Sequence, residues 1–573
     1  MSNLDWIVLI LTLGCIILYG VYKSRTTRNL HGYFLGNREM PWYLVLLSIM
    51  GTQASAITFI SAPGQAYTDG MRFVQYYFGL PLAMVILCIT FVPKFRKLHI
   101  YTAYELLEKR FDVKTRTLTS FIFLVSRGLS TGISVYAPSI ILSSLLGWNI
   151  YWTNLFMGGL LIIYTVTGGA KAVAHTQKLQ LIVVFIGLFL AAYICVSMLP
   201  EGVGLSQALE IGGKMGKMNV ITTGFSEDGF DWTDRYNIFS GLIGGFFFAL
   251  SYFGTDQSQV GRYLTASSDK ESKMGLLMNG IVKIPMQFLI LLIGILVFTF
   301  YQFNPSPLLF NSVPVENARN TVYRNTIDSL QIEHNKLGDS KKQAVSLLSN
   351  DLILNTNSDS SVARLSRINK SQDSLRNEVK KVIMASNANA ETNDTNYIFL
   401  RFVVDHLPKG LIGLLIAIIF LASWGSIAAA LNSLASASVV DFHKKFIHKN
   451  LSEEQDYRIS RWYTLFWGIF CVVAAQFVIG MGSLIEAVNI LGSWFYGIIL
   501  GIFLVAFYFK SIRGNAVFWS ALVSQVLIIV IYFQSGIGWL WLTLVGAFMV
   551  ILFSFIISLF ENKTGNNITV VNP

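Results

Sequence analysis

The chain has 573 residues, of which 53% are hydrophobic and only 13% charged, with 43 Lys and Arg against 32 Asp and Glu. This composition excludes an ordinary soluble enzyme and indicates an all-α polytopic membrane protein. The basic excess does not indicate a nucleic-acid partner, because Lys and Arg gather in short loops beside apolar segments, as is typical of proteins in a lipid bilayer.

Hydropathy over windows of about 19 residues predicts about 13 transmembrane helices. The expected spans lie near residues 4–22, 41–66, 72–95, 115–146, 149–167, 178–199, 237–264, 274–302, 407–440, 460–480, 484–508, 515–533 and 537–560. Basic clusters follow the first, third, ninth and eleventh spans, whereas the loops at 480–484 and 534–537 carry no Lys or Arg. The positive-inside rule therefore places the N-terminus outside and the C-terminus inside.

The N-terminal span has no basic segment before it and no small-residue cleavage pattern, so we expect it to be retained rather than removed as a signal peptide. The four cysteines stand singly in apolar spans, without metal-ligand spacing, and we expect free, packed thiols. They are Cys15, Cys88, Cys195 and Cys471.

Two apolar spans contain a polar or glycine-rich interruption. The first is Gly51–Ala56, which leads into Ala62–Gly64, and the second is Tyr252–Gln257. Irregular backbone is tolerated at membrane depth only where it lines a cavity or binds an ion. The sequence therefore predicts two broken helices around a solute site.

A polar insertion at about 303–406 separates two apolar spans on the predicted external side. Apolar residues recur there in steps of three and four, with Gln372 at a missing position, and 355–361 is rich in Asn and Ser. This pattern predicts a helical hairpin outside the membrane. It is either a solvated spacer or a docking site for a periplasmic partner.

The chain has no Walker loop, HExxH, GxSxG or paired intramembrane carboxylates, so we expect no enzyme. Transport is then passive or driven by an ion gradient. Small residues and hydroxyls fill Ala422–Ser436, which suits either close helix packing or a small cation bound by hard oxygens.

Two cations fall near the middle of their spans, Arg127 and Lys283. Charge at this depth faces a cavity or a partner. Arg127 pairs with Asp256, caps a carbonyl of a broken helix, or presents a guanidinium fork to a carboxylate. Asp256 itself could bind a substrate cation, a proton or Arg262.

Four segments in this order resemble the sodium/solute symporter family: Thr102–Phe111 (TAYELLEKRF), 168–180 (GGAKAVAHTQKLQ), Gln257–Leu264 (QSQVGRYL) and Pro408–Asp441. The resemblance covers nearly all of the chain except 303–406. It implies a LeuT-like core of 5+5 inverted repeats, with spans two to six against spans seven to eleven.

On this basis the chain divides into six parts. They are an extra N-terminal helix and cytoplasmic loop (1–40), the first repeat (41–200), an external loop with the start of the second repeat (201–302), the hairpin (303–406), the rest of the second repeat (407–514) and C-terminal helices with a short tail (515–573).

The resemblance also implies a sodium site on spans two and nine, with one sodium ion per cycle. Its matching residues are Gly51, Ala54, Ala422, Gly425 and Ser426. Similar relatives have Ser at the position of Gly425, so one hydroxyl ligand is missing, and Ser423 or water would replace it. A further sodium site lacks its ligands, because Gln177, Ala428 and Ala429 stand at the matching positions.

The expected substrate-binding residues are Gln53, Thr58, Tyr77, Arg127, Asp256, Lys283 and Tyr496. An arginine in the helix of Arg127 resembles family members that carry sialic acid or monocarboxylates. Thr58 and Tyr77 replace the residues that hold sugar hydroxyls in the sugar-carrying branch. Other aromatic residues, Tyr76, Phe78, Trp494 and Phe495 among them, could line the pocket or only pack.

Together these features predict a sodium-coupled symporter of the bacterial cytoplasmic (inner) membrane that imports a small organic solute, a carboxylate-bearing anion, by alternating access. Two alternatives stay open. One is a proton-coupled carrier that uses Asp256 in place of sodium. The other is a transceptor with vestigial transport, suggested by the reduced sodium site at Gly425 and Gln177.

Overall fold

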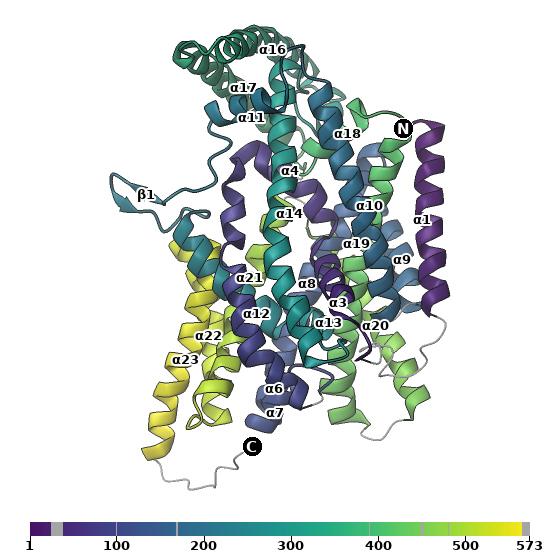
Figure 1. The fold of residues 1–573 in the computed structure, drawn as a ribbon, viewed down its shortest axis with the longest axis vertical. Helices are drawn as coiled ribbons and strands as arrows, with labels where there is room; N and C mark the ends of the chain where they lie inside the picture. Colours follow the sequence, from purple (N-terminus) through teal and green to yellow (C-terminus); the bar gives the residue numbers. More distant parts are fainter. Residues whose placement is uncertain are drawn as a thin grey trace.

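The computed structural model describes residues 1–24, 38–98, 100–167, 170–388, 390–448, 452–478 and 481–563. Within these ranges the chain is a bundle of helices with one small antiparallel sheet, β1 (Phe225–Ser226) and β2 (Gly229–Phe230), in the loop between α11 (Leu205–Lys214) and η4 (Ser240–Gly244) (Figure 1). The predicted helical membrane fold is confirmed apart from this sheet.

The helices follow one another along the chain with few long connections. They are α1 (Asn3–Ser24), α3 (Trp42–Gln53), α4 (Ala56–Asp69), η2 (Met71–Tyr77), α5 (Leu80–Ile86), η3 (Leu87–Phe91), α6 (Val92–Lys97), α7 (Glu105–Arg110), α8 (Val113–Leu146), α9 (Ile150–Thr167), α10 (Ala170–Ser197), α11 (Leu205–Lys214), η4 (Ser240–Gly244), α12 (Gly245–Thr255), α13 (Gln257–Tyr263), α14 (Asp269–Phe303), α15 (Ser312–Arg319), α16 (Arg324–Ile353), α17 (Asp359–Ser386), α18 (Ile398–His406), α19 (Leu411–Ala437), η5 (Ser438–Ile447), α20 (Glu453–Ala475), α21 (Leu484–Tyr508), α22 (Gly514–Ser535) and α23 (Trp539–Lys563).

Among the described residues, 8 helices are long and apolar enough to cross a membrane, or 9 if one bent pair counts as a single span. Shorter apolar helices lie at Asn3–Ile16, Ile150–Ile163 and Ser240–Thr255. The total of 13 crossings and the orientation of the termini therefore stay predictions. Figure 1 places the N-terminus and the hairpin at one end of the bundle, and the last turn of α23 at the other end.

Helix α19 lies at the centre of the bundle, and 89% of its most apolar window is buried. It packs against α1, α3, α8, α10 and α20. Its many Gly, Ala and Ser residues allow these neighbours to approach closely. By contrast, only 33% and 39% of the corresponding windows of α22 and α23 are buried, so these two helices lie at the edge of the bundle (Figure 1).

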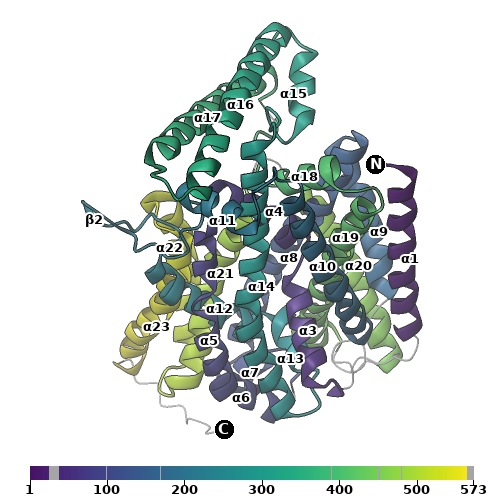
Figure 2. The same ribbon diagram turned by 45° about the horizontal axis from the view of Figure 1, so that its top comes forward.

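The insertion forms an arm of α15, α16 and α17 that projects from one end of the bundle (Figure 2). Helices α16 and α17 pack against each other, and a short turn at 354–358 joins them. Leu375, Val379 and Ile383 are buried in one apolar cluster of the arm and Leu365 in another, whereas Val382 is only partly buried. Gln372 is buried too, at 4% exposure.

All four cysteines are free thiols, but the expectation that all are packed is wrong for one of them. Cys15 is exposed, because α1 lies at the periphery of the bundle and turns part of its surface outward. The other three are buried.

Candidate functional site

The first predicted break lies between α3 and α4, which are bent by 63° relative to each other. Ala54 and Ser55 separate the two helices. The Ser55 N–H donates to Gln53 O at 3.0 Å instead of continuing the helical ladder to Gly51 O. A helix that stops in this way leaves carbonyl oxygens available to a cation at membrane depth.

The predicted sodium ligands come from this break and from α19, which packs against α3. Ala54 and Ala422 are buried, and the Ser426 hydroxyl donates to Ser423 O at 2.9 Å. The Ser423 hydroxyl donates to Ser134 O at 3.4 Å and keeps its lone pairs, so its replacement of the missing hydroxyl stays a prediction.

Gln177 of α10 lies between the two sets of predicted ligands. Its side-chain amide donates to Gly425 O at 3.3 Å and to the Thr52 hydroxyl at 3.4 Å, and its oxygen accepts from the Ser48 hydroxyl at 3.1 Å. A Cβ at Gly51 would lie 2.8 Å from the Gln177 side chain. Glycine is therefore required on α3 for this amide to reach α19.

The second predicted break is also confirmed. Asp256 separates α12 from α13 and caps α13, where its carboxylate accepts from the Ser258 N–H at 2.8 Å and the Ser258 hydroxyl at 2.6 Å. The other carboxylate oxygen pairs with Arg127 of α8. Tyr496 of α21 bridges the pair, since it lies 3.1 Å from Arg127 Nη2 and 3.3 Å from Asp256 Oδ2.

Of the interpretations left open for these two residues, the structure shows the ion pair. The guanidinium group also lies 5.4 Å from the centre of the Tyr252 ring, in a cation–π contact. No ion pair between Asp256 and Arg262 occurs in the part of the chain that the structure describes.

A cavity of about 130 Å³ lies between the two breaks. Six of the seven predicted substrate-binding residues line it: Gln53, Thr58, Tyr77, Arg127, Lys283 and Tyr496. Asp256 does not line the cavity and lies behind Arg127, to which it is bound. Tyr76 and Ser426 also reach the cavity wall, whereas Phe78, Trp494 and Phe495 do not.

Lys283 of α14 is the second cation of the cavity and is only 2% exposed. Its Nζ lies 5.5 Å from the centre of the Tyr77 ring. Among the described residues, no carboxylate forms an ion pair with it. A buried ammonium group without a carboxylate partner favours an anionic ligand.

Sequence reasoning missed a row of hydroxyls on α8 that also lines the cavity, formed by Ser130, Thr131 and Ser134. Each hydroxyl donates to the carbonyl four residues earlier, at 2.6 to 3.1 Å. Their protons are thus used inside the helix, and they offer acceptor lone pairs to a solute. The spacing from Arg127 places all four residues on one helix face, which is the signal that could have found them.

Polar contacts join distant elements at the end of the bundle away from the hairpin. Asp441 is fully buried and pairs with Arg116 at 2.6 Å, and it accepts hydrogen bonds from Thr102 and Ser120. Arg116 also pairs with Glu108 at 2.6 Å. Segments Thr102–Phe111 and Pro408–Asp441, picked out in the sequence, therefore meet here and tie α7 and α8 to η5.

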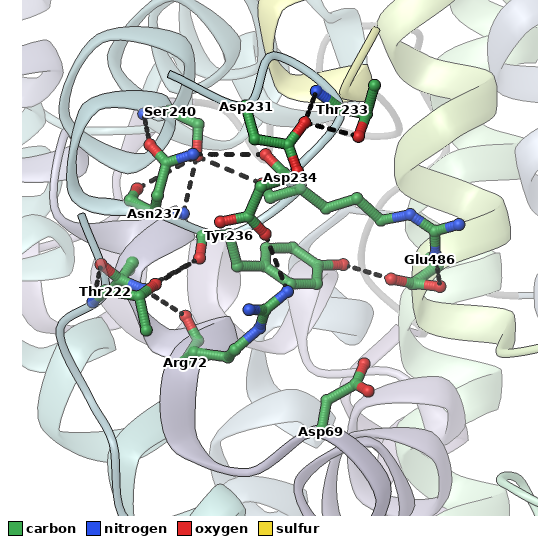
Figure 3. Close-up of polar contacts among 12 residues, drawn as sticks. Asp69, Arg72, Thr222, Asp231, Thr233, Asp234, Tyr236, Asn237, Ser240 and Glu486 are labelled. Atoms are coloured by element: carbon green, nitrogen blue, oxygen red, sulfur yellow. Dashed lines mark hydrogen bonds and ion pairs between the residues drawn. The ribbon is translucent and has the colours of Figure 1, made fainter. Parts of the chain in front are cut away.

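A second polar network involves the loop between α11 and η4 (Figure 3). Glu486, at the start of α21, accepts from the Tyr236 hydroxyl at 2.6 Å and pairs with Arg235 at 2.9 Å. Arg72 of η2 pairs with Asp234 at 2.8 Å. The loop thus connects the segment after α4 to α21, and Figure 3 shows Asp69 beside this group.

Two interrupted helices that enclose a cavity between polar networks define a secondary carrier. A sequence model described as the sodium:solute symporter family matches residues 33–324 and 378–524. The chain belongs to this family, and it is a sodium-coupled symporter of a small solute.

Relatives and a solved structure agree with this assignment. The chain is 24% identical over 573 residues to the sodium/sialic acid symporter NanT of Aliivibrio fischeri, covering 99% of this chain and 95% of NanT. It is 25% identical over 557 residues to the sodium/sialic acid symporter SiaT of Proteus mirabilis, covering 96% and 93%. It also resembles the human sodium/iodide cotransporter, with 30% identity over 290 residues, 50% of this chain and 43% of the cotransporter.

The fold is similar to that of a solved Na⁺-coupled sialic acid symporter in a substrate-bound outward-open state. The TM-score is 0.74 at 23% identity, with 98% of each chain covered.

Proposed function

We propose that this protein imports a small hydroxylated carboxylate together with sodium across the bacterial cytoplasmic (inner) membrane. The observation that carries the proposal is the charge of the central cavity. Asp256 neutralises Arg127, whereas Lys283 is buried in the cavity wall and forms no ion pair with a carboxylate of the described residues. One positive charge is left over, and a monoanion would balance it.

The rest of the cavity supports a solute that carries hydroxyl or amide donors besides its carboxylate. The α8 hydroxyls present acceptor lone pairs, and Tyr76, Tyr77 and Tyr252 supply aromatic surface. A sugar acid has both groups. Sialic acid, the solute named for the relatives NanT and SiaT, is the first candidate.

Arg127 would act as a fork that is already oriented. Asp256 and Tyr496 hold its Nη2 in place, so the guanidinium group loses little freedom when a solute carboxylate approaches. In this arrangement Lys283 provides the charge and Arg127 provides a directed N–H donor.

For sodium, we propose the oxygen atoms of Gly51, Ala54, Ala422, Gly425 and Ser426 as the site, with one ion per cycle. The interrupted hydrogen-bond ladder at Ser55 supports it. The Gln177 amide already donates to Gly425 O, so sodium would share or displace that hydrogen bond.

The proton-coupled alternative is less well supported by the contacts of Asp256. Its carboxylate accepts two hydrogen bonds from Ser258, pairs with Arg127 and does not line the central cavity. The role of the hairpin as a docking site for a periplasmic partner stays a prediction.

The experiment is uptake of labelled N-acetylneuraminate and lactate into proteoliposomes under a sodium or a choline gradient. We expect sodium-dependent uptake that Lys283→Met abolishes. Lys270→Met is the matched control, because Lys270 is exposed at the start of the same helix. Uptake that is equal in sodium and choline, or unchanged in Lys283→Met, would contradict the proposal.

A further inference from the structure

A second cavity, of about 510 Å³, lies between the insertion and the outer ends of α4 and α14. We call it the hairpin cavity; its wall includes Tyr67, Gln302, Lys341, Gln372 and Arg376. It shares no lining residue with the central cavity. Figures 1 and 2 both show the hairpin helices α16 and α17 over this end of α14, and α14 contacts α16.

The hairpin cavity is strongly cationic. Five basic side chains line it against two carboxylates; the basic residues are Lys217, Lys341, Lys370, Arg376 and Lys380, and the acidic ones are Asp373 and Asp394. Asp394 is already engaged, because it accepts from the backbone N–H groups of Phe310 and Asn311 at 2.8 and 2.9 Å. Five positive charges against two negative ones leave the wall with a net formal charge of +3.

Lys341 carries the main energetic argument. It is only 3% exposed, and its ammonium group donates to the neutral Gln372 Oε1 at 2.8 Å. No ion pair of Lys341 occurs among the described residues. Burial lowers the pKa of Lys341 to about 7. An isolated buried charge is unfavourable until an anion lies beside it.

Several other polar atoms of the wall also lack partners among the described residues. They are Gln372 Nε2, Asn369 Nδ2, Arg376 Nε and Gln302 Oε1. Three of the four are donors, and a buried donor without an acceptor is unfavourable. Since Gln372 is 4% exposed and Gln302 is 2% exposed, solvent reaches these two side chains poorly.

We propose that the hairpin cavity is a second binding site, for a small organic anion that bears a carboxylate. The ammonium group of Lys341 and the guanidinium group of Arg376 would bind the carboxylate, and the amides of Gln372 and Asn369 would donate to its remaining oxygens. The site extends the proposed function but does not depend on it.

The site also contacts the outer half of the first broken helix. Lys217, in its wall, donates to the carbonyl of Thr68 in the last turn of α4. Tyr67 and Thr68 themselves line the cavity. An anion bound here therefore contacts both the insertion and a helix that takes part in the central cavity.

The test uses the purified full-length protein in sodium-free choline buffer, where binding does not require the sodium-coupled central site. N-acetylneuraminate, lactate and chloride are titrated calorimetrically at constant ionic strength into the wild type, Lys341→Met and Lys342→Met. Lys342 is the matched control, because it is the next residue of α16 and is exposed. A thermal melt of each variant checks that it is folded.

We expect at least one carboxylate to bind, with affinity reduced at least 10-fold in Lys341→Met and unchanged in Lys342→Met. At pH 8, binding should also take up protons, seen as a dependence of the binding enthalpy on the buffer, because an anion beside Lys341 raises the pKa of that amine. Lys217, Lys370, Lys380 and Arg376 oppose this protonation, while Asp373 favours it. His334 also lies on α16 and stays neutral at pH 8, since burial lowers its pKa to about 4.

Three results would overturn the proposal: no carboxylate binding in choline, equal binding by wild type and Lys341→Met, or chloride binding as tightly as the carboxylates. If sodium-driven uptake fails but carboxylates still bind in choline, the proposed transport function is wrong and the proposed hairpin site is supported. Which carboxylate binds distinguishes the transported solute from a separate anionic ligand.

Discussion

The ion pair between Arg127 and Asp256 gives the sharpest test of the central architecture. Both side chains are buried, at 11% and 2% exposure. Removal of one partner leaves the other charge uncompensated at membrane depth, which costs about 3–5 kcal/mol, whereas removal of both leaves no charge. We therefore expect Asp256→Asn and Arg127→Met each to lower the free energy of unfolding strongly. The double variant should lose at least about 2 kcal/mol less than the sum of the two single losses.

The assay is thermal unfolding of the purified variants in one detergent, followed by circular dichroism. The double variant should melt above the less stable single variant, even though it carries more substitutions. Arg235→Met is the matched control, because it breaks an ion pair with Glu486 in which the Arg side chain is 55% exposed. Such a pair contributes about 0–1 kcal/mol. Melting temperatures that fall additively, or a control that falls as far as the single variants, would refute the inferred pairing.

Three further predictions concern ions and pH. Gly425→Ser should lower the sodium concentration for half-maximal uptake by about fivefold (~1 kcal/mol), because it restores a hydroxyl ligand. The new Cβ would lie 2.5 Å from Gln180 Oε1, which has to move aside. Gly425→Ala makes the same contact without a hydroxyl, so it should not lower that sodium concentration. One sodium ion with one monoanion moves no net charge, so uptake should not respond to a potassium-diffusion potential; acceleration by an inside-negative potential would indicate more sodium. Because burial lowers the pKa of Lys341 to about 7, folding becomes more favourable as pH rises from 7 towards 10, by at most about 1.4 kcal/mol per pH unit. The melting temperature of Lys341→Met should therefore rise less between pH 7 and 9 than that of the wild type. An equal rise of the melting temperature with pH in both proteins would contradict this.

The sequence predicted the central cavity well because its signals are local. Glycine and aspartate inside apolar spans mark both breaks, and a charge at the middle of a span marks Arg127 and Lys283. These features require only position along one helix and the cost of polar groups in hydrocarbon. Six predicted residues consequently meet at one cavity.

What the sequence could not predict depends on contacts between distant elements. The sequence offered the pair of Arg127 with Asp256, 129 residues away, only as one of several interpretations, and it gave no sign that Gln177 reaches Gly425 across 248 residues. No periodicity reports such pairings. The exposure of Cys15 was missed for a related reason, because an apolar span looks the same in sequence whether it packs inside the bundle or at its edge.

The second half of α4 is in direct contact with the segment that follows the insertion. A Cβ at Gly64 would lie 1.8 Å from Thr395 O, so α4 and the segment after the hairpin are in backbone contact. Asn396 next to it binds Gly482 O at 2.9 Å and accepts from the Leu484 N–H at 3.1 Å. The Ser61 hydroxyl on α4 lies 3.1 Å from that of Ser483.

Because the central cavity lies below these contacts, any outward opening that separates α4 from α21 must also move the segment that anchors the hairpin. Packed interfaces of this kind have discrete arrangements rather than a continuous range. A ligand in the hairpin cavity, which touches both α4 and the insertion, would favour the arrangement to which it binds more tightly, by the difference in its two affinities. Under the proposal above, an anion bound in the hairpin cavity would thus bias the alternating-access equilibrium.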